Sequence, residues 1–147
     1  MLLEFVNPLN EYPLAFPTCE CIHIVGFAIS LGTVGLVDLR MLGVGVEAKV
    51  PELARDLSLW TAVGIATMIL SGMLLFSSDP DRYYLNGAFQ LKMVCLVLAI
   101  VFNYTIHSKA LKNGGTGTGA KAIAGISLAL WTSIVFLGIF IAFVGAE

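Results

Sequence analysis

Charged residues are scarce in this chain, and their scarcity excludes most soluble folds. Only 12% of the 147 residues are Asp, Glu, Lys or Arg, whereas 58% are hydrophobic. Soluble domains carry about a quarter charged residues. The formal net charge is −2 and no basic stripe is present, which excludes nucleic acid as a partner. The composition predicts a single membrane domain, residues 1–147, with the lipid bilayer as a partner.

Cysteines and leader features are also few. The three cysteines are Cys19, Cys21 and Cys95. Cys19 and Cys21 lie two positions apart, so on a helix their side chains diverge and we expect no disulfide between them. The first 18 residues contain no Lys or Arg and no long apolar core followed by small residues. We therefore do not expect a cleavable signal peptide.

Long apolar runs dominate the rest of the chain. They cover about 19–46, 57–76, 88–111 and 122–144, and each is long enough to cross a bilayer, which takes about 20 apolar residues. Charged, proline-containing or glycine-rich linkers separate them. The pattern predicts an all-α fold, a four-transmembrane-helix bundle.

The segment before the first run, residues 1–18, is predicted to hold a surface helix. Its apolar residues crowd one arc of a short helix: Leu2, Leu3, Phe5, Val6 and Leu9. Such a helix lies in the membrane interface. Most basic residues fall on the side of the first and third linkers, and only Arg82 and Lys92 fall on the other. The positive-inside rule then places both termini in the periplasm, outside a bacterial inner membrane.

Ionisable groups on the first and third runs predict two polar layers. Helices one and three run in the same direction, so Glu20, His23 and Lys92 should lie near the outer face. Asp38, Asn103 and His107 should lie near the inner face, and Arg40 should snorkel to the inner interface. We expect a Glu20–Lys92 pair outside and an Asp38–His107 pair inside. Such pairs can also serve packing alone, at about 0.6 to 2 kcal/mol each.

His23 is the sharpest candidate for chemistry. Cys19 and Glu20 lie four and three residues before it, so all three converge on one helix face. Cys19 and His23 could bind a transition metal, or His23 could be an axial ligand of haem b. His107 could likewise bind a metal or be an axial ligand of haem. The two histidines lie at different depths in the membrane, so they cannot both be ligands of the same haem.

Other patterns carry no chemistry. GGTGTGAK lacks the adjacent Gly-Lys and the preceding strand of a nucleotide-binding phosphate loop. No serine or cysteine has both a base and an orienting group nearby, so we find no catalytic motif and leave enzyme activity open. Trp60 and Trp131 are interpreted as interface anchors.

The segment FPTCECIHIVGFAISLGTVGLVDLRMLG resembles a family of small bacterial four-helix membrane proteins of unknown function. The family pattern, FPxxExxH followed by DLRxLG, matches a set of positions spread along the first run: Phe16, Pro17, Glu20, His23, Asp38, Leu39, Arg40, Leu42 and Gly43. The resemblance extends to the third run, from Phe89 to His107. The layout is more loosely similar to membrane b-type cytochromes and copper-resistance membrane proteins, which hold histidines near both faces of a four-helix bundle.

Three functions remain open from the sequence. The first is an electron-transfer subunit holding haem b through His23 and His107, with Glu20, Lys92, Asp38 and Asn103 as supporting groups. The second is a proton- or metal-linked carrier or channel, with a relay of Glu20, His23, Asp38 and His107. The third is a structural or assembly subunit of a larger membrane complex. Little core is available to four short spans, so we expect a homo-oligomer or a larger complex.

Overall fold

Four long helices make up most of the protein. The structure is a computed structural model that describes residues 7–45 and 47–144. The long helices are α2 (Ala15–Met41), α3 (Val50–Ser78), α5 (Gly87–Phe102) and α7 (Thr118–Phe140). A π-helical turn, η1 (Asn103–His107), and α6 (Ser108–Lys112) continue α5, so that Gly87–Lys112 forms one rod. Short helices α1 (Pro8–Glu11) and α4 (Pro80–Tyr84) precede α2 and α5.

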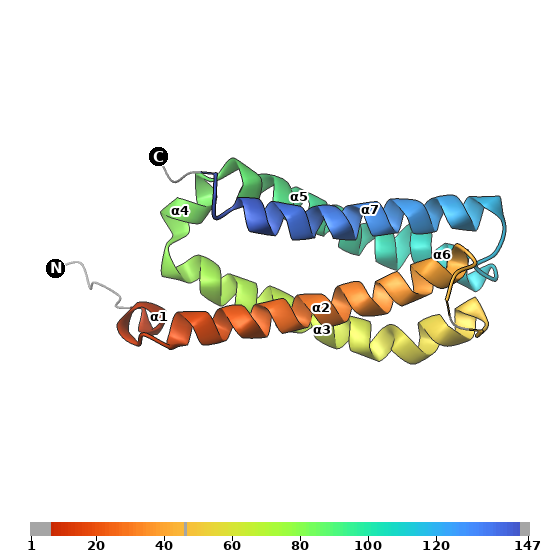
Figure 1. Cartoon of the computed structure of the whole chain (residues 1–147), viewed down its shortest axis with the longest axis horizontal. Helices are drawn as coiled ribbons and strands as arrows, with labels where there is room; N and C mark the ends of the chain where they lie inside the picture. The colour runs from red at the N-terminus through yellow and green to blue at the C-terminus, as the bar shows by residue number, and fades with distance from the viewer. Residues whose placement is uncertain (1–6, 46, 145–147) are drawn as a thin grey trace.

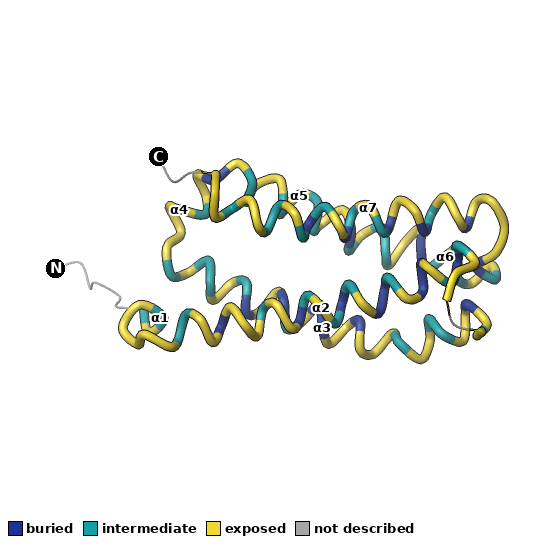
Figure 2. Tube along the Cα trace, viewed as in Figure 1, coloured by how far each residue is buried: buried dark blue, intermediate teal, exposed yellow. Residues whose placement is uncertain are grey.

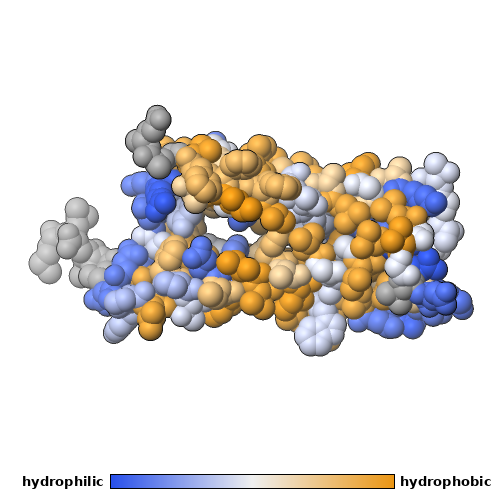
Figure 3. All heavy atoms as spheres, in the orientation of Figure 1, coloured by the Kyte–Doolittle hydropathy of each residue, from blue (hydrophilic) through white to orange (hydrophobic). Residues whose placement is uncertain are grey.

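All four rods are long and apolar enough to cross a membrane, and the described residues hold no strand. The all-α four-helix bundle is therefore confirmed, and the chain is an integral membrane protein. Figure 3 shows hydrophobic atoms over the middle of one face and hydrophilic atoms toward both ends. This distribution matches a bundle whose middle lies in lipid and whose ends lie in water.

The helices form two antiparallel pairs, α2 with α3 and α5 with α7, and α2 and α7 join the pairs (Figure 1). The pairs lie apart at the end that holds α1 and α4, here called the α4 end. They approach each other at the end that holds α6 and the glycine-rich loop, here called the α6 end. Dark-blue, buried segments gather where the pairs approach, whereas α5 is mostly exposed (Figure 2). The core therefore lies toward the α6 end and the middle of the bundle.

Glycines let α2 and α3 approach closely. A Cβ on Gly64 would lie 2.6 Å from Ser30 Oγ and 2.8 Å from the Gly26 carbonyl oxygen. A Cβ on Gly26 would lie 2.9 Å from the backbone nitrogen of Met68. Small residues at such crossings are the usual way for membrane helices to gain packing, since lipid supplies no hydrophobic drive between them.

Trp131 is the largest side chain of the core. It is 1% exposed and packs with Val34, Ile65, Ala99 and Ile134, drawn from all four rods. The interpretation of Trp131 as an interface anchor was therefore wrong: its indole fills the middle of the bundle, where the small Ala99 faces it. Trp60, in contrast, is 57% exposed on α3.

Helix ends differ from the apolar runs by several residues. α3 begins at Val50, with Pro51 in its first turn, where proline fits because no N–H is needed there. α2 ends at Met41, and Gly43 follows with φ of +91°, a left-handed conformation that stops the helix. Four of the five apolar residues of the expected surface helix, Leu2, Leu3, Phe5 and Val6, lie outside the described residues.

Candidate functional site

Asp38 and His107 form the most buried polar pair in the described bundle. Nε2 of His107 lies 2.6 Å from Oδ1 of Asp38, and the two side chains are 3% and 0% exposed, His107 and Asp38 respectively. Asp38 comes from the last full turn of α2, and His107 is the last residue of η1. The expected inner pair is therefore present, and it ties the first helix pair to the second.

The π-helical turn aims His107 at Asp38. In an uninterrupted α-helix, His107 would point about 80° away from Ala99, which lies eight residues earlier and faces the core. A turn closed by i→i+5 bonds holds one more residue than an α turn and rotates the residues after it back by about 100°. His107 then shares the direction of the 1% exposed Ala99 and is itself 2% exposed.

The contact with His107 uses only one of the two carboxylate oxygens of Asp38. Its Oδ2 is fully buried and has no hydrogen-bond partner among residues 7–45 and 47–144. An unsatisfied buried carboxylate oxygen is costly, because the oxygen has left water without a replacement donor. Oδ2 is therefore the atom of the pair at which a further hydrogen-bond donor would be stabilising.

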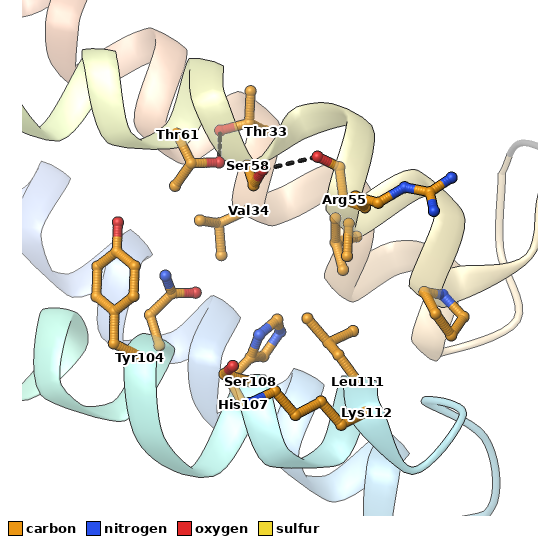
Figure 4. Close-up of a pocket in the computed structure, with 14 residues that line it drawn as sticks. Thr33, Val34, Arg55, Ser58, Thr61, Tyr104, His107, Ser108, Leu111 and Lys112 are labelled. Carbon is orange, nitrogen blue, oxygen red and sulfur yellow. Dashed lines mark hydrogen bonds between the residues drawn. The ribbon is translucent and has the colours of Figure 1, made fainter.

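A cavity of about 380 Å³, with a lining that is more apolar than polar, reaches His107 from outside (Figure 4). It lies between α2 and α3 on one side and η1 and α6 on the other, and most of its polar walls are hydroxyl and amide groups: Thr33, Ser58, Thr61, Asn103, Tyr104 and Ser108. Arg55 and Lys112 also line the cavity, and both residues are exposed. The described lining residues include no carboxylate.

Two threonines close the wall opposite His107. The Thr61 hydroxyl donates to Thr33 Oγ1 at 2.8 Å, and both side chains are buried. Sequence patterns do not predict this contact, since a threonine in an apolar run usually bonds its own helix. Thr61 lies three residues before Gly64, and the close crossing of α2 and α3 at Gly64 is what brings the two hydroxyls together.

The second histidine lies far from this cavity. His23 precedes Asp38 by fifteen positions on the same helix, which is about 22 Å. Its Nδ1 lies 3.1 Å from Ser71 Oγ, and its ring packs against Gly72, where a Cβ would lie 3.1 Å from Cε1. Cys19 is buried nearby, with Sγ 3.6 Å from the Ser71 carbonyl oxygen. Ser71, which no sequence motif singles out, thus contacts both predicted metal ligands.

The expected Glu20–Lys92 pair was wrong. The ion pairs among the described residues are Lys49–Glu52, Arg55–Asp56 and the Asp38–His107 contact. Glu20 is exposed at the α4 end of α2, whereas Lys92 is partly buried beside α7, close to where a Gly138 Cβ would lie. The two helix pairs lie apart at this end, so the carboxylate and the ammonium do not meet.

The remaining predicted residues lie at the α6 end. Asn103 lines the cavity beside His107. Arg40 is half-buried and donates from Nε to the Ala48 carbonyl oxygen at 2.7 Å, which fixes the loop after α2. Within residues 7–45 and 47–144, no three His, Cys, Asp or Glu side chains gather as metal ligands would. The haem and metal assignments stay predictions.

Comparisons with known proteins give a family but no activity. No curated protein and no solved structure matches this chain. A family model matches residues 13–144, nearly the full length, and its members are described as a family of unknown function. The chain therefore belongs to this family, DUF6644, whose match spans all four membrane helices.

Proposed function

We propose that this protein moves protons across a membrane and that the Asp38–His107 pair binds the proton in transit. The observation that carries the proposal is the 2.6 Å contact between two nearly inaccessible titratable groups, of which His107 lines a cavity that also holds hydroxyl and amide groups. Ionisable side chains at membrane depth are costly, and proton relays are among the functions that retain them. The unpartnered Oδ2 of Asp38 is where a proton can be held.

Buried hydroxyls support a route along α2 and α3. Thr33 and Thr61 stand beside the cavity, Ser30 lies at 0% exposure one turn further, and Ser71 contacts His23 toward the α4 end. Ser30 lies at the level of Gly64, which is seven residues before Ser71 on α3. The rise per residue of an α-helix therefore separates Ser30 and Ser71 by about 10 Å along the bundle. Within that interval α2 and α3 pack closely at Gly26 and Met68, so the buried hydroxyls support the part of the route from the cavity to Ser30.

Proton flux in liposomes tests the proposal. The protein is reconstituted with a pH-sensitive dye trapped inside, and a potassium gradient with valinomycin imposes a membrane potential. We expect acidification that exceeds protein-free liposomes and that Asp38→Asn abolishes. Asp56→Asn is the matched control, because Asp56 is exposed on α3, outside the bundle. Equal flux in wild type and Asp38→Asn would contradict the proposal.

Haem b binding at His23 is a second candidate. One ring nitrogen, Nδ1, is oriented by Ser71, and no hydrogen bond to Nε2 forms among the described residues. Histidine ligands are commonly oriented in this way, through the nitrogen that does not bind the metal. His107 fits less well, because its Nε2 is held by Asp38. A Soret band lost in His23→Ala and kept in His107→Ala would support haem; no Soret band in either redox state would exclude it.

The direction of insertion also remains a proposal. Six of the eight Lys and Arg residues lie toward the α6 end, and the positive-inside rule places that end in the cytoplasm. Both described chain ends lie at the opposite end of the bundle (Figure 1). A reporter enzyme that is active only in the periplasm should therefore work when fused to the C-terminus, and an inactive fusion would reverse the orientation.

A further inference from the structure

A second cavity lies at the α6 end, and the proton route makes no use of it. Its volume is about 480 Å³, and it lies between the end of α2, the start of α3 and the glycine-rich loop before α7. Three cationic side chains line it: Arg40, Lys49 and Lys121. No carboxylate occurs among its described lining residues.

Arg40 is positioned for an anion. Its Nε donates to the Ala48 carbonyl oxygen at 2.7 Å, and it forms no ion pair with the described carboxylates. The terminal nitrogens of the guanidinium are therefore left for another acceptor. A guanidinium fixed in this way offers two parallel N–H donors, which match two oxygens of a phosphate group.

The two lysines add positive charge that neighbouring carboxylates neutralise only weakly. Lys49 lies 3.4 Å from Glu52, but both side chains are largely exposed, at 82% and 55%, and such a surface pair is weak. Lys121, also exposed, has no ion-pair partner within residues 7–45 and 47–144. The charged side chains that line the described part of the cavity are therefore all cationic.

The glycine-rich loop lines the cavity with Gly114, Thr116 and Gly117. Gly114, Gly115 and Gly117 have φ of +98°, +63° and +92°, which residues with a Cβ rarely adopt. Gly115 packs so tightly on α3 that a Cβ would lie 2.5 Å from Val50 Cγ1. The loop is thus held against the first residue of α3, and its backbone can approach a ligand closely.

We propose that this cavity binds a phosphate group, carried by an anionic phospholipid or free in solution. The cavity lies at the ends of α2 and α3, which are long and apolar enough to span a membrane, and the ends of such helices reach the level of lipid headgroups. Basic pockets between membrane helices at that level hold anionic headgroups. The proposal is independent of proton movement.

Thermal unfolding of the full chain in neutral detergent tests it. The probes are dihexanoyl phosphatidylglycerol, inorganic phosphate and, as the zwitterionic control, dihexanoyl phosphatidylcholine. We expect phosphatidylglycerol to raise Tm and phosphatidylcholine to leave it unchanged. A rise with inorganic phosphate alone would identify free phosphate as the ligand source. Equal shifts with phosphatidylglycerol and phosphatidylcholine, or no shift with any probe, would overturn the proposal.

Variants connect the effect to the cavity. Arg40→Gln and Lys121→Gln should each weaken binding about fivefold, from the contribution of one basic residue near a charged headgroup. Lys121 is exposed at the start of α7, so its variant should fold even if Arg40→Gln does not. Lys109→Gln is the control, because Lys109 is exposed at the same end and lines neither cavity. Unchanged affinity in Lys121→Gln would contradict the proposal.

Discussion

Nε2 of His107 lies 2.6 Å from Oδ1 of Asp38, although 69 positions separate the two residues in the chain. The contact joins the α2–α3 pair to the α5–α7 pair at the end of the bundle where they converge. It also stands beside the cavity that Figure 4 shows. One contact thus serves both the packing of the bundle and the proposed proton site, and suitable variants can separate these two roles.

Removal of the imidazole should destabilise the protein more than neutralisation of the carboxylate. His107→Ala leaves Asp38 buried without its partner, which typically costs about 3–5 kcal/mol. Asp38→Asn keeps an oxygen that can accept from His107, and we expect about 1 kcal/mol. Reversible unfolding in detergent–denaturant mixtures measures both. Equal destabilisation by His107→Ala and Asp38→Asn would contradict the predicted order, and wild-type stability in both would show that the pair contributes little to the bundle.

Deletion of Thr105 should be tolerated. Thr105 lies on the exposed side of η1, and loss of one residue turns the π turn into an α turn without rotating the preceding Ala99 relative to His107. Deletion of the equally exposed Val97, within the regular part of α5, should instead rotate the residues before it by about 100° relative to Ala99 and His107, so that the two parts of the rod no longer face the core together. Size-exclusion profiles and melting curves compare the two. If the Val97 deletion folds better than the Thr105 deletion, the π turn does not aim His107.

Gly64→Ala should separate α2 from α3. The added methyl group would lie 2.6 Å from Ser30 Oγ and against the Gly26 backbone, so the helices must shift. Overpacking of this kind costs about 1–3 kcal/mol. Gly32→Ala is the matched control on α2, where a Cβ meets nothing within 4 Å, and it should stabilise the helix by about 0.5–1 kcal/mol. Equal melting temperatures would show that the crossing can relax.

Lys92→Met should not lower stability. Lys92 is partly buried, and no carboxylate pairs with it among the described residues. An ammonium at membrane depth without a partner is unfavourable, and a methionine of similar length keeps the packing against α7. We expect an unchanged or higher Tm, with Lys109→Met as a neutral control. A lower Tm would reveal an anionic partner of Lys92 at the α4 end.

The sequence was sufficient for the four helices and the inner pair, because apolar run length and helix direction fix which groups share a level. It was not sufficient for contacts that depend on the angle between helix pairs. Glu20 and Lys92 share a level, yet the pairs lie apart there. The position of Trp131 within its apolar run suggested an interface anchor. Its packing in one core cluster with the small Ala99 depends on how the helices are arranged. Ala99, Asn103 and His107 are spaced four residues apart, as in a regular α-helix, so their spacing does not indicate the π turn. The Thr33–Thr61 hydrogen bond depends on the close approach of α2 and α3 at Gly64.

The most direct measurement compares proton flux through Asp38→Glu and Asp38→Asn in the same liposomes. Both variants keep an oxygen that can accept a hydrogen bond from His107, but only Glu keeps a carboxyl group that binds and releases a proton. Flux that persists in Asp38→Glu and falls to the protein-free level in Asp38→Asn is the result we predict. Flux that is the same in both variants would show that the carboxyl group at position 38 does not carry the proton.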